Sequence, residues 1–227
     1  MLRNSRLLGV VGLAFTMMLM LGSTSFAADT IARQEEKSGV AVAPLSESEM
    51  EGLLFTREEE KVARDVYLTL GAQWNVRVFD NIAQSEQRHM DAVLTLVDRY
   101  GLTDPVGDNG IGIFTDPDLQ AMYDDLVAQG EASLVDALEV GIYIEEVDIL
   151  DLQELIAESS KSDLDRVYGN LLDGSENHLR GFVSAWERET GESYTPTLMT
   201  DDEFQAIVGD ADSDTSSGAA RRRGNRR

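Results

Sequence analysis

The chain has 227 residues, a hydrophobic content of 42% and a formal net charge of -23 at pH 7. This length allows one domain of about 150 residues with tails on either side. The strong negative charge argues against a nucleic-acid-binding protein, because no basic face is available to neutralise phosphates. The absence of cysteine excludes disulfides, cysteine-ligated zinc or iron–sulfur clusters, and a cysteine-linked lipid anchor.

Residues 1–27 have the pattern of a secretory signal peptide. Arg3 and Arg6 precede an apolar run over residues 7–21, which is short for a bilayer span, and small residues before Ala28 offer a cleavage site. We therefore expect an exported protein, periplasmic or extracellular. An uncleaved leader is the alternative and would be its only membrane attachment. Residues 28–47 are polar and aperiodic and predict a flexible linker.

The first helix is predicted over residues 49–71, with Ser48 and Glu51 as a capping box. Its inward stripe contains one acid, Glu60. Glu58 and Glu59 fall off this stripe, and we expect both on a solvated face. The full stripe is Leu53, Thr56, Glu60, Ala63, Tyr67 and Leu70.

The second helix is predicted over residues 79–100 and carries the most informative pattern in the chain. Apolar residues recur at steps of three and four, and the same stripe passes through Glu86 and His89. Burying a charge costs on the order of several kcal/mol unless it is paired or bound to a metal. An inward Glu-x-x-His pair is the ligand pattern of two-metal carboxylate sites in helix bundles.

Residues 101–114 are rich in glycine and predict a loop that crosses the bundle, followed by a short helix from the Thr115 cap to Gly130. The third long helix is predicted over residues 131–159. Its stripe contains Glu145 and Asp148, three residues apart on one face, whereas Glu139 and Glu146 fall off the stripe.

The fourth long helix is predicted over residues 163–190, capped by Ser162, with Ser175 and His178 on its stripe. Gly174 inside this helix indicates a local bulge or a close approach to a neighbouring helix. The predicted helical domain covers residues 48–192. Residues 193–227 follow as a short helix near 201–208 and a disordered tail.

Six polar residues interrupt the apolar stripes near the middle of the four helices. Oxygen and nitrogen donors of this kind suit two iron ions, with manganese or zinc as alternatives. A single buried Glu or His is more often a hydrogen-bonded core residue, but six on converging stripes favour a metal site. Tyr67 is an ordinary core aromatic or a neighbour of the metals. The six candidate ligands are Glu60, Glu86, His89, Glu145, Asp148 and His178.

Four segments carry a family resemblance: EEEKVARDVY, SEQRHM, IEEVDILDL and GSENHLRGF. The pattern Glu60-x-x-Ala63-x-x-x-Tyr67 followed by Phe79-x-x-Ile82-Ala83-x-x-Glu86-x-x-His89 resembles the first helical pair of the ferritin-like superfamily that includes rubrerythrin. More closely, residues 48–192 resemble an uncharacterised bacterial and archaeal family, domain of unknown function 2202. The resemblance implies an all-α fold, a ferritin-like antiparallel four-helix bundle whose long crossover contains the short extra helix. It also implies a dinuclear iron site with oxidase, peroxidase or ferroxidase-type chemistry toward oxygen or peroxide.

Two features depart from this pattern. Ser175 stands where the superfamily usually has a glutamate before His178, and Asp148 is a candidate to compensate. Without cysteine there is no rubredoxin-type centre, so turnover needs an outside electron donor. The alternatives to an oxidoreductase are a metal-buffering protein and a metal-free helical interaction module. Homodimerisation is compatible with such a bundle, but no second apolar seam identifies an interface.

Overall fold

The computed structural model describes residues 43–209, and the regular secondary structure of this part of the chain consists of helices, without strands. The predicted all-α class is therefore confirmed. The expected signal peptide, most of the expected linker and the tail from residue 210 lie outside the described residues. No helix among the described residues combines the length and apolar character needed to cross a membrane. The helices are α1 Glu47–Trp74, α2 Arg77–Arg99, α3 Pro117–Gly130, α4 Leu134–Glu158, α5 Ser162–Thr190 and α6 Asp201–Val208.

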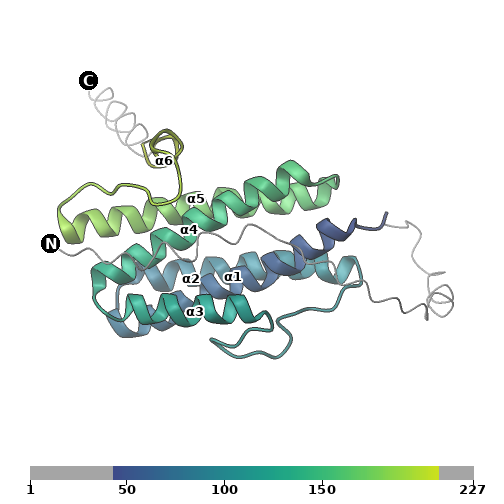
Figure 1. The fold of residues 1–227 in the computed structure, drawn as a ribbon, viewed down its shortest axis with the longest axis horizontal. Coiled ribbons are helices and arrows are strands. Elements are labelled where there is room, and N and C mark those ends of the chain that lie inside the picture. Colours follow the sequence, from purple (N-terminus) through teal and green to yellow (C-terminus); the bar gives the residue numbers. More distant parts are fainter. Residues whose placement is uncertain (1–42, 210–227) are drawn as a thin grey trace, which may run out of the picture. The chain divides into compact units, whose positions relative to one another are not determined.

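The four long helices form two antiparallel hairpins that pack against each other (Figure 1). Asn75 and Val76 alone connect α1 to α2, and residues 159–161 connect α4 to α5. Asn75 ends α1 in the left-handed conformation, with φ of 54°, and its N–H bonds to the Gly71 carbonyl. Such a cap ends the helix sharply and allows the chain to reverse direction. Contacts of α1 with α4 and of α2 with α5 join the hairpins.

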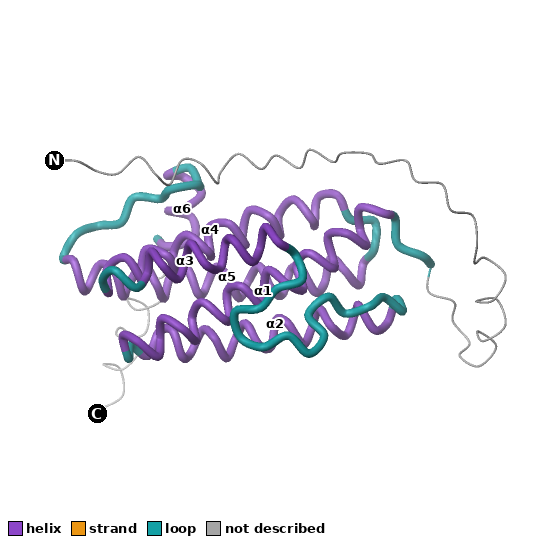
Figure 2. The backbone as a smooth tube through the Cα atoms, turned by 60° about the horizontal axis from the view of Figure 1, so that its bottom comes forward, coloured by secondary structure: helices purple, strands orange, loops and turns teal. Residues whose placement is uncertain are grey.

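A long loop leads from α2 to α3, and α3 packs against both α1 and α4 (Figure 2). The loop is held by side chains of α1. Arg57 pairs with Asp104 at 3.1 Å, and the fully buried Lys61 donates to the Gly110 carbonyl at 2.7 Å. Lys61 also pairs with Asp65. One face of α1 is therefore occupied by anchoring the crossover loop.

The helix starts differ from the sequence prediction by a few residues, and in α1, α3 and α4 a different or unpredicted side chain forms the cap. Ser46 and Glu49 form the capping box of α1, two residues before the predicted Ser48 and Glu51. Asp116, not Thr115, caps α3, and Ser133 caps α4. The predicted Ser162 cap is wrong, since Ser162 is already helical and Lys161 occupies the cap position. The capping box of α1 satisfies two backbone donors, the N–H groups of Ser46 and Glu49.

The core consists of two apolar clusters with a polar layer between them along the long helices. One cluster includes Tyr67, Phe79 and Phe182, whose rings pack within 4.9–6.3 Å of one another. The other includes Leu53 and Val93. On α1 and α2 the buried residues between these clusters include several acids and a histidine. The apolar clusters supply the stability that permits a polar layer at mid-helix.

Candidate metal centre

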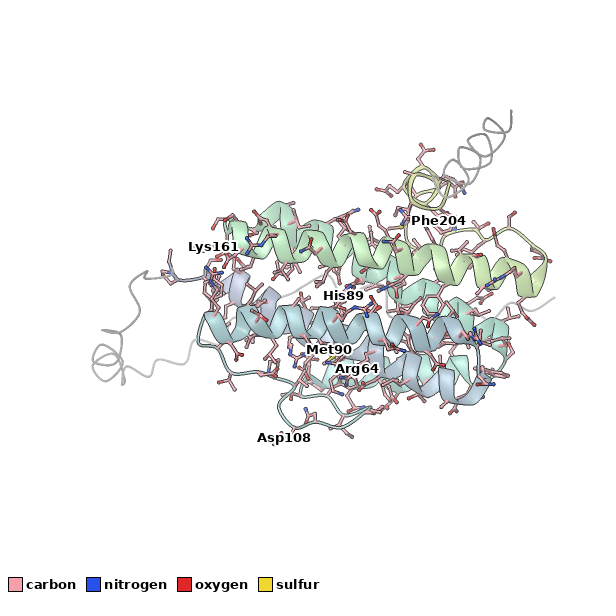
Figure 3. The ribbon with its side chains drawn as sticks, turned by 180° about the vertical axis from the view of Figure 1, so that it is seen from behind. Arg64, His89, Met90, Asp108, Lys161 and Phe204 are labelled. Carbon is pink, nitrogen blue, oxygen red and sulfur yellow. The ribbon has the colours of Figure 1, made fainter. Side chains whose placement is uncertain are left out.

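The six candidate ligands are all buried and come from four helices. Each helix places its polar residues inward because they continue its apolar stripe. Glu60, Glu86 and Glu145 are each only 1% exposed. Figure 3 shows His89 in the layer between α2 and α5. The six are Glu60 on α1, Glu86 and His89 on α2, Glu145 and Asp148 on α4, and His178 on α5.

Glu86 lies at the centre, with each of its oxygens facing a different histidine. Oε2 lies 2.8 Å from Nδ1 of His89, and Oε1 lies 2.8 Å from Nδ1 of His178. The two imidazole rings stack, with centroids 5.3 Å apart and planes at 30°. The two histidines from opposite hairpins therefore present the same nitrogen to one carboxylate.

A second carboxylate faces each imidazole from the other helix of its hairpin. Glu60 Oε2 lies 3.1 Å from Nδ1 of His89. Glu145 Oε2 lies 3.5 Å from Nδ1 of His178. The centre thus has two similar halves, one from α1 and α2 and one from α4 and α5, and Glu86 belongs to both.

Two hydroxyl groups fix the acids contributed by α4. Tyr67 donates a hydrogen bond of 2.6 Å to Glu145 Oε1. The Ser175 hydroxyl donates to Asp148 Oδ2. Tyr67 is fully buried beside the centre, as the sequence hypothesis allowed, and it also packs on Phe79 and Phe182.

Several oxygen and nitrogen atoms that could bind a metal ion are buried in this layer without a hydrogen-bond partner. They are Glu60 Oε1, Glu86 Oε1, Asp148 Oδ1 and His178 Nδ1. Glu86 Oε1 and His178 Nδ1 are close to each other but are not aligned for a hydrogen bond. An unsatisfied buried polar group costs about 1–3 kcal/mol, so native interiors rarely contain several together. The donor set therefore fits cations placed among these atoms.

The acids of the centre repel one another and resist ionisation. Burial raises the pKa of Glu60 well above its usual range, and the charge of Asp148 adds to the rise. Burial and the charge of Glu145 raise the pKa of Asp148 to about 7. The pKa of Glu145 is raised by burial and by the charge of Glu86. His89 and His178 oppose the rise at Glu60 and Glu145 but do not cancel it.

Glu86 and the histidines behave in the opposite way. Burial raises the pKa of Glu86, but the two imidazoles outweigh it and lower the pKa to about 2. Burial lowers the pKa of each histidine, but the facing carboxylates outweigh it. The pKa rises to about 11 for His89 and about 10 for His178. Without a metal, both imidazoles therefore hold a second proton, which a metal ion at Nδ1 would displace.

The prediction of a solvated face for Glu58 and Glu59 is wrong, since they are only 4% and 8% exposed. Glu58 accepts the backbone N–H groups of Thr115 at 2.6 Å and Asp116 at 3.2 Å. Burial and the charge of Asp151 raise the pKa of Glu59 well above its usual range. The partners of Glu58 are loop amides, which leave no pattern in the sequence.

Glu146 is also buried, although it lies beside the stripe of candidate ligands on α4 rather than on it. Its carboxylate accepts backbone N–H groups of residues 197–199, at 2.6 Å for the closest, Leu198. It thereby fixes the segment that leads to α6. In both acidic runs, Glu58-Glu59-Glu60 and Glu145-Glu146, one acid faces the centre and a neighbour anchors a distant segment.

The comparisons with known proteins agree with this helical domain. The model of the family described as uncharacterized protein domain DUF2202 matches residues 49–211. The chain belongs to this family. It is 47% identical over 165 residues to the uncharacterized protein MJ0754 of Methanocaldococcus jannaschii, covering 73% of this chain and 89% of that protein.

The fold is also similar to a solved structure of this family. The crystal structure of hypothetical protein MJ0754 from Methanococcus jannaschii matches with a TM-score of 0.72 and 46% identity, covering 76% of this chain and 98% of that one. The helical domain is thus shared by most of both chains.

Proposed function

We propose that this protein binds two divalent metal ions in a ferritin-like antiparallel four-helix bundle. The observation that carries the proposal is the position of Glu86, whose two oxygens face Nδ1 of His89 and of His178 at 2.8 Å each. A carboxylate placed in this way suits a bridge between two cations. Glu60 would help to hold one ion and Glu145 the other, and Asp148 would be a further ligand.

The charge balance supports two ions. Glu60, Glu86, Glu145 and Asp148 together carry four negative charges when ionised, which two divalent cations neutralise if both imidazoles are uncharged. Mixed carboxylate and imidazole donors suit iron, manganese and zinc. We propose iron first, because the resemblance to the ferritin-like superfamily implies it, with manganese or zinc as alternatives.

Bound iron would supply redox chemistry toward oxygen or peroxide. The residues of this chain would hold the ions, keep bulk water out of a layer that is buried on all four helices, and orient Glu145 through Tyr67. Because the chain has no cysteine, electrons for repeated turnover would come from an outside donor. With residues 1–27 as a signal peptide, we place this activity in the periplasm or outside the cell.

Metal uptake tests the proposal. Purified metal-free protein is loaded anaerobically with Fe(II), and separately with Mn(II) or Zn(II), and the bound metal is counted. We expect two ions per chain, and a loss of both in Glu86→Gln. Asp91→Asn is the matched control, since Asp91 is an exposed acid on the same helix. Absence of uptake of every metal would overturn the proposal and favour a metal-free interaction module.

Rapid mixing separates an oxidoreductase from a metal buffer. The Fe(II)-loaded protein is mixed with oxygen or with peroxide, and oxidation is followed by absorbance. Oxidation faster than that of free Fe(II) supports an oxidase or peroxidase. Oxidation no faster than that of free Fe(II), with two ions still bound, supports buffering.

A further inference from the structure

The two helices that carry histidine differ at the residue three positions earlier. On α2 this residue is Glu86, three before His89; on α5 it is Ser175, three before His178. Residues three apart share a helix face, so Ser175 faces the centre as Glu86 does. Helix α5 thus presents a short hydroxyl at the place where α2 presents a carboxylate.

Ser175 holds the carboxylate of Asp148, on α4, near the place that an acid on α5 would occupy. It is fully buried, and its hydroxyl contacts Asp148 Oδ2 on α4 as well as the Leu171 carbonyl oxygen at 3.0 Å. The other carboxylate oxygen, Asp148 Oδ1, is buried and has no hydrogen-bond partner. One oxygen of Asp148 is therefore fixed by α5, which leaves the other available to a ligand.

The preceding residue, Gly174, determines where His89 lies. A Cβ atom at position 174 would lie 2.5 Å from Nε2 and 2.7 Å from Cε1 of His89, closer than real Cβ contacts. The His89 ring therefore rests against bare backbone of α5, with Nδ1 turned toward Glu60 and Glu86. Any side chain at 174 would push the ring away from this position.

We propose that Gly174 and Ser175 are positioning residues of the metal centre, Gly174 by seating His89 and Ser175 by presenting the free oxygen of Asp148. The inference rests on the proposed metal binding. Together the two residues make α5 set the positions of ligands that belong to α2 and α4. This accounts for a glycine in the middle of a helix and for a serine where an acid stands on α2.

The variant Gly174→Ala tests the role of Gly174, and Gly169→Ala is the matched control on the same helix. Gly169 also lies within α5, but nothing lies within 4 Å of a Cβ added there. Zn(II) affinity is measured by competition with a chromophoric chelator. We expect Gly174→Ala to weaken binding about 10–100-fold, the usual effect of disturbing a ligand's support, and Gly169→Ala to leave it unchanged. Equal affinities in the two variants would overturn the role of Gly174.

The role of Ser175 is tested with two variants, one that lacks the hydroxyl and one that keeps it. We expect Ser175→Ala to weaken Zn(II) binding by about the same 10–100-fold and Ser175→Thr to restore most of it. The EPR spectrum of the Mn(II)-loaded protein should change in the alanine variant and return toward that of the parent in the threonine variant. A lower melting temperature in Ser175→Ala with unchanged affinity and spectrum would show a purely structural role and overturn the proposal.

Histidine NMR of the metal-free protein keeps this inference separate from the proposed function. If the parent binds no metal, the proposed function fails, but the packing claim is still tested. The ¹⁵N shifts of the His89 ring should change in Gly174→Ala and stay constant in Gly169→Ala. Unchanged His89 shifts in a folded Gly174→Ala protein would overturn the positioning role of Gly174 whether or not metal binds.

Discussion

Replacing Asp148 by asparagine should have opposite effects on stability with and without metal. In the metal-free protein, burial and the charge of Glu145 raise the pKa of Asp148 from 3.8 to about 7. The folded state keeps a proton that the unfolded chain releases, so stability falls as the pH rises from about 4 toward 7. Asparagine does not titrate, so the variant lacks this loss.

The size of the effect follows from the number of pH units between the starting pH and the raised pKa. About two pH units lie between pH 5 and the raised pKa, and each is worth about 1.4 kcal/mol. The free energy of unfolding of Asp148→Asn, minus that of the parent, should therefore increase by about 3 kcal/mol between pH 5 and pH 8. Urea unfolding with a chelator present measures this difference.

With metal bound, the variant should gain less stability than the parent, because asparagine replaces a charged ligand oxygen. If the variant binds Zn(II) 100-fold more weakly, it loses about 2.7 kcal/mol of the stabilisation that saturating metal gives the parent. The same urea titrations with Zn(II) measure that loss. A difference that stays constant with pH in chelator, or an equal gain from metal in both proteins, would refute the reasoning.

Three further predictions concern proton release, the crossover loop and the first helix cap. Metal binding at pH 7 should release at least two protons per chain, because His89 and His178 both carry a positive charge without metal. Calorimetry in buffers of different ionisation enthalpy measures the number of protons released. Glu58→Gln should cost about 1–3 kcal/mol of stability through weaker bonds to Thr115 and Asp116, with unchanged metal affinity; denaturant unfolding beside the exposed control Glu47→Gln tests it. Burial raises the pKa of Glu49, but hydrogen bonds from Ser46 and Ser160 outweigh it and lower the pKa to about 2. The stabilisation that Glu49 gives the folded state is therefore complete above pH 4.5 and is lost as the pH falls toward 2. An NMR titration midpoint of Glu49 near 4.5 would contradict this.

Helical periodicity made the inward polar residues predictable. Glu60, Glu86 and His178 lie on stripes of apolar residues, and a residue's place on a stripe depends only on the local repeat of the helix. The helix starts were less predictable. Two Ser-x-x-Glu patterns overlap near residue 48, and local sequence does not decide which one caps α1.

The sequence by itself determined the all-α class, the approximate helix positions and the burial of six polar residues, since each follows from the order of neighbours along one helix. Only the tertiary structure decided which of these residues meet. It also decided that Glu58 anchors a loop, that Gly174 seats His89, and that Ser175 holds Asp148. These contacts join separate helices and loops, and their geometry depends on how the helices pack, which the order of residues within one helix does not specify.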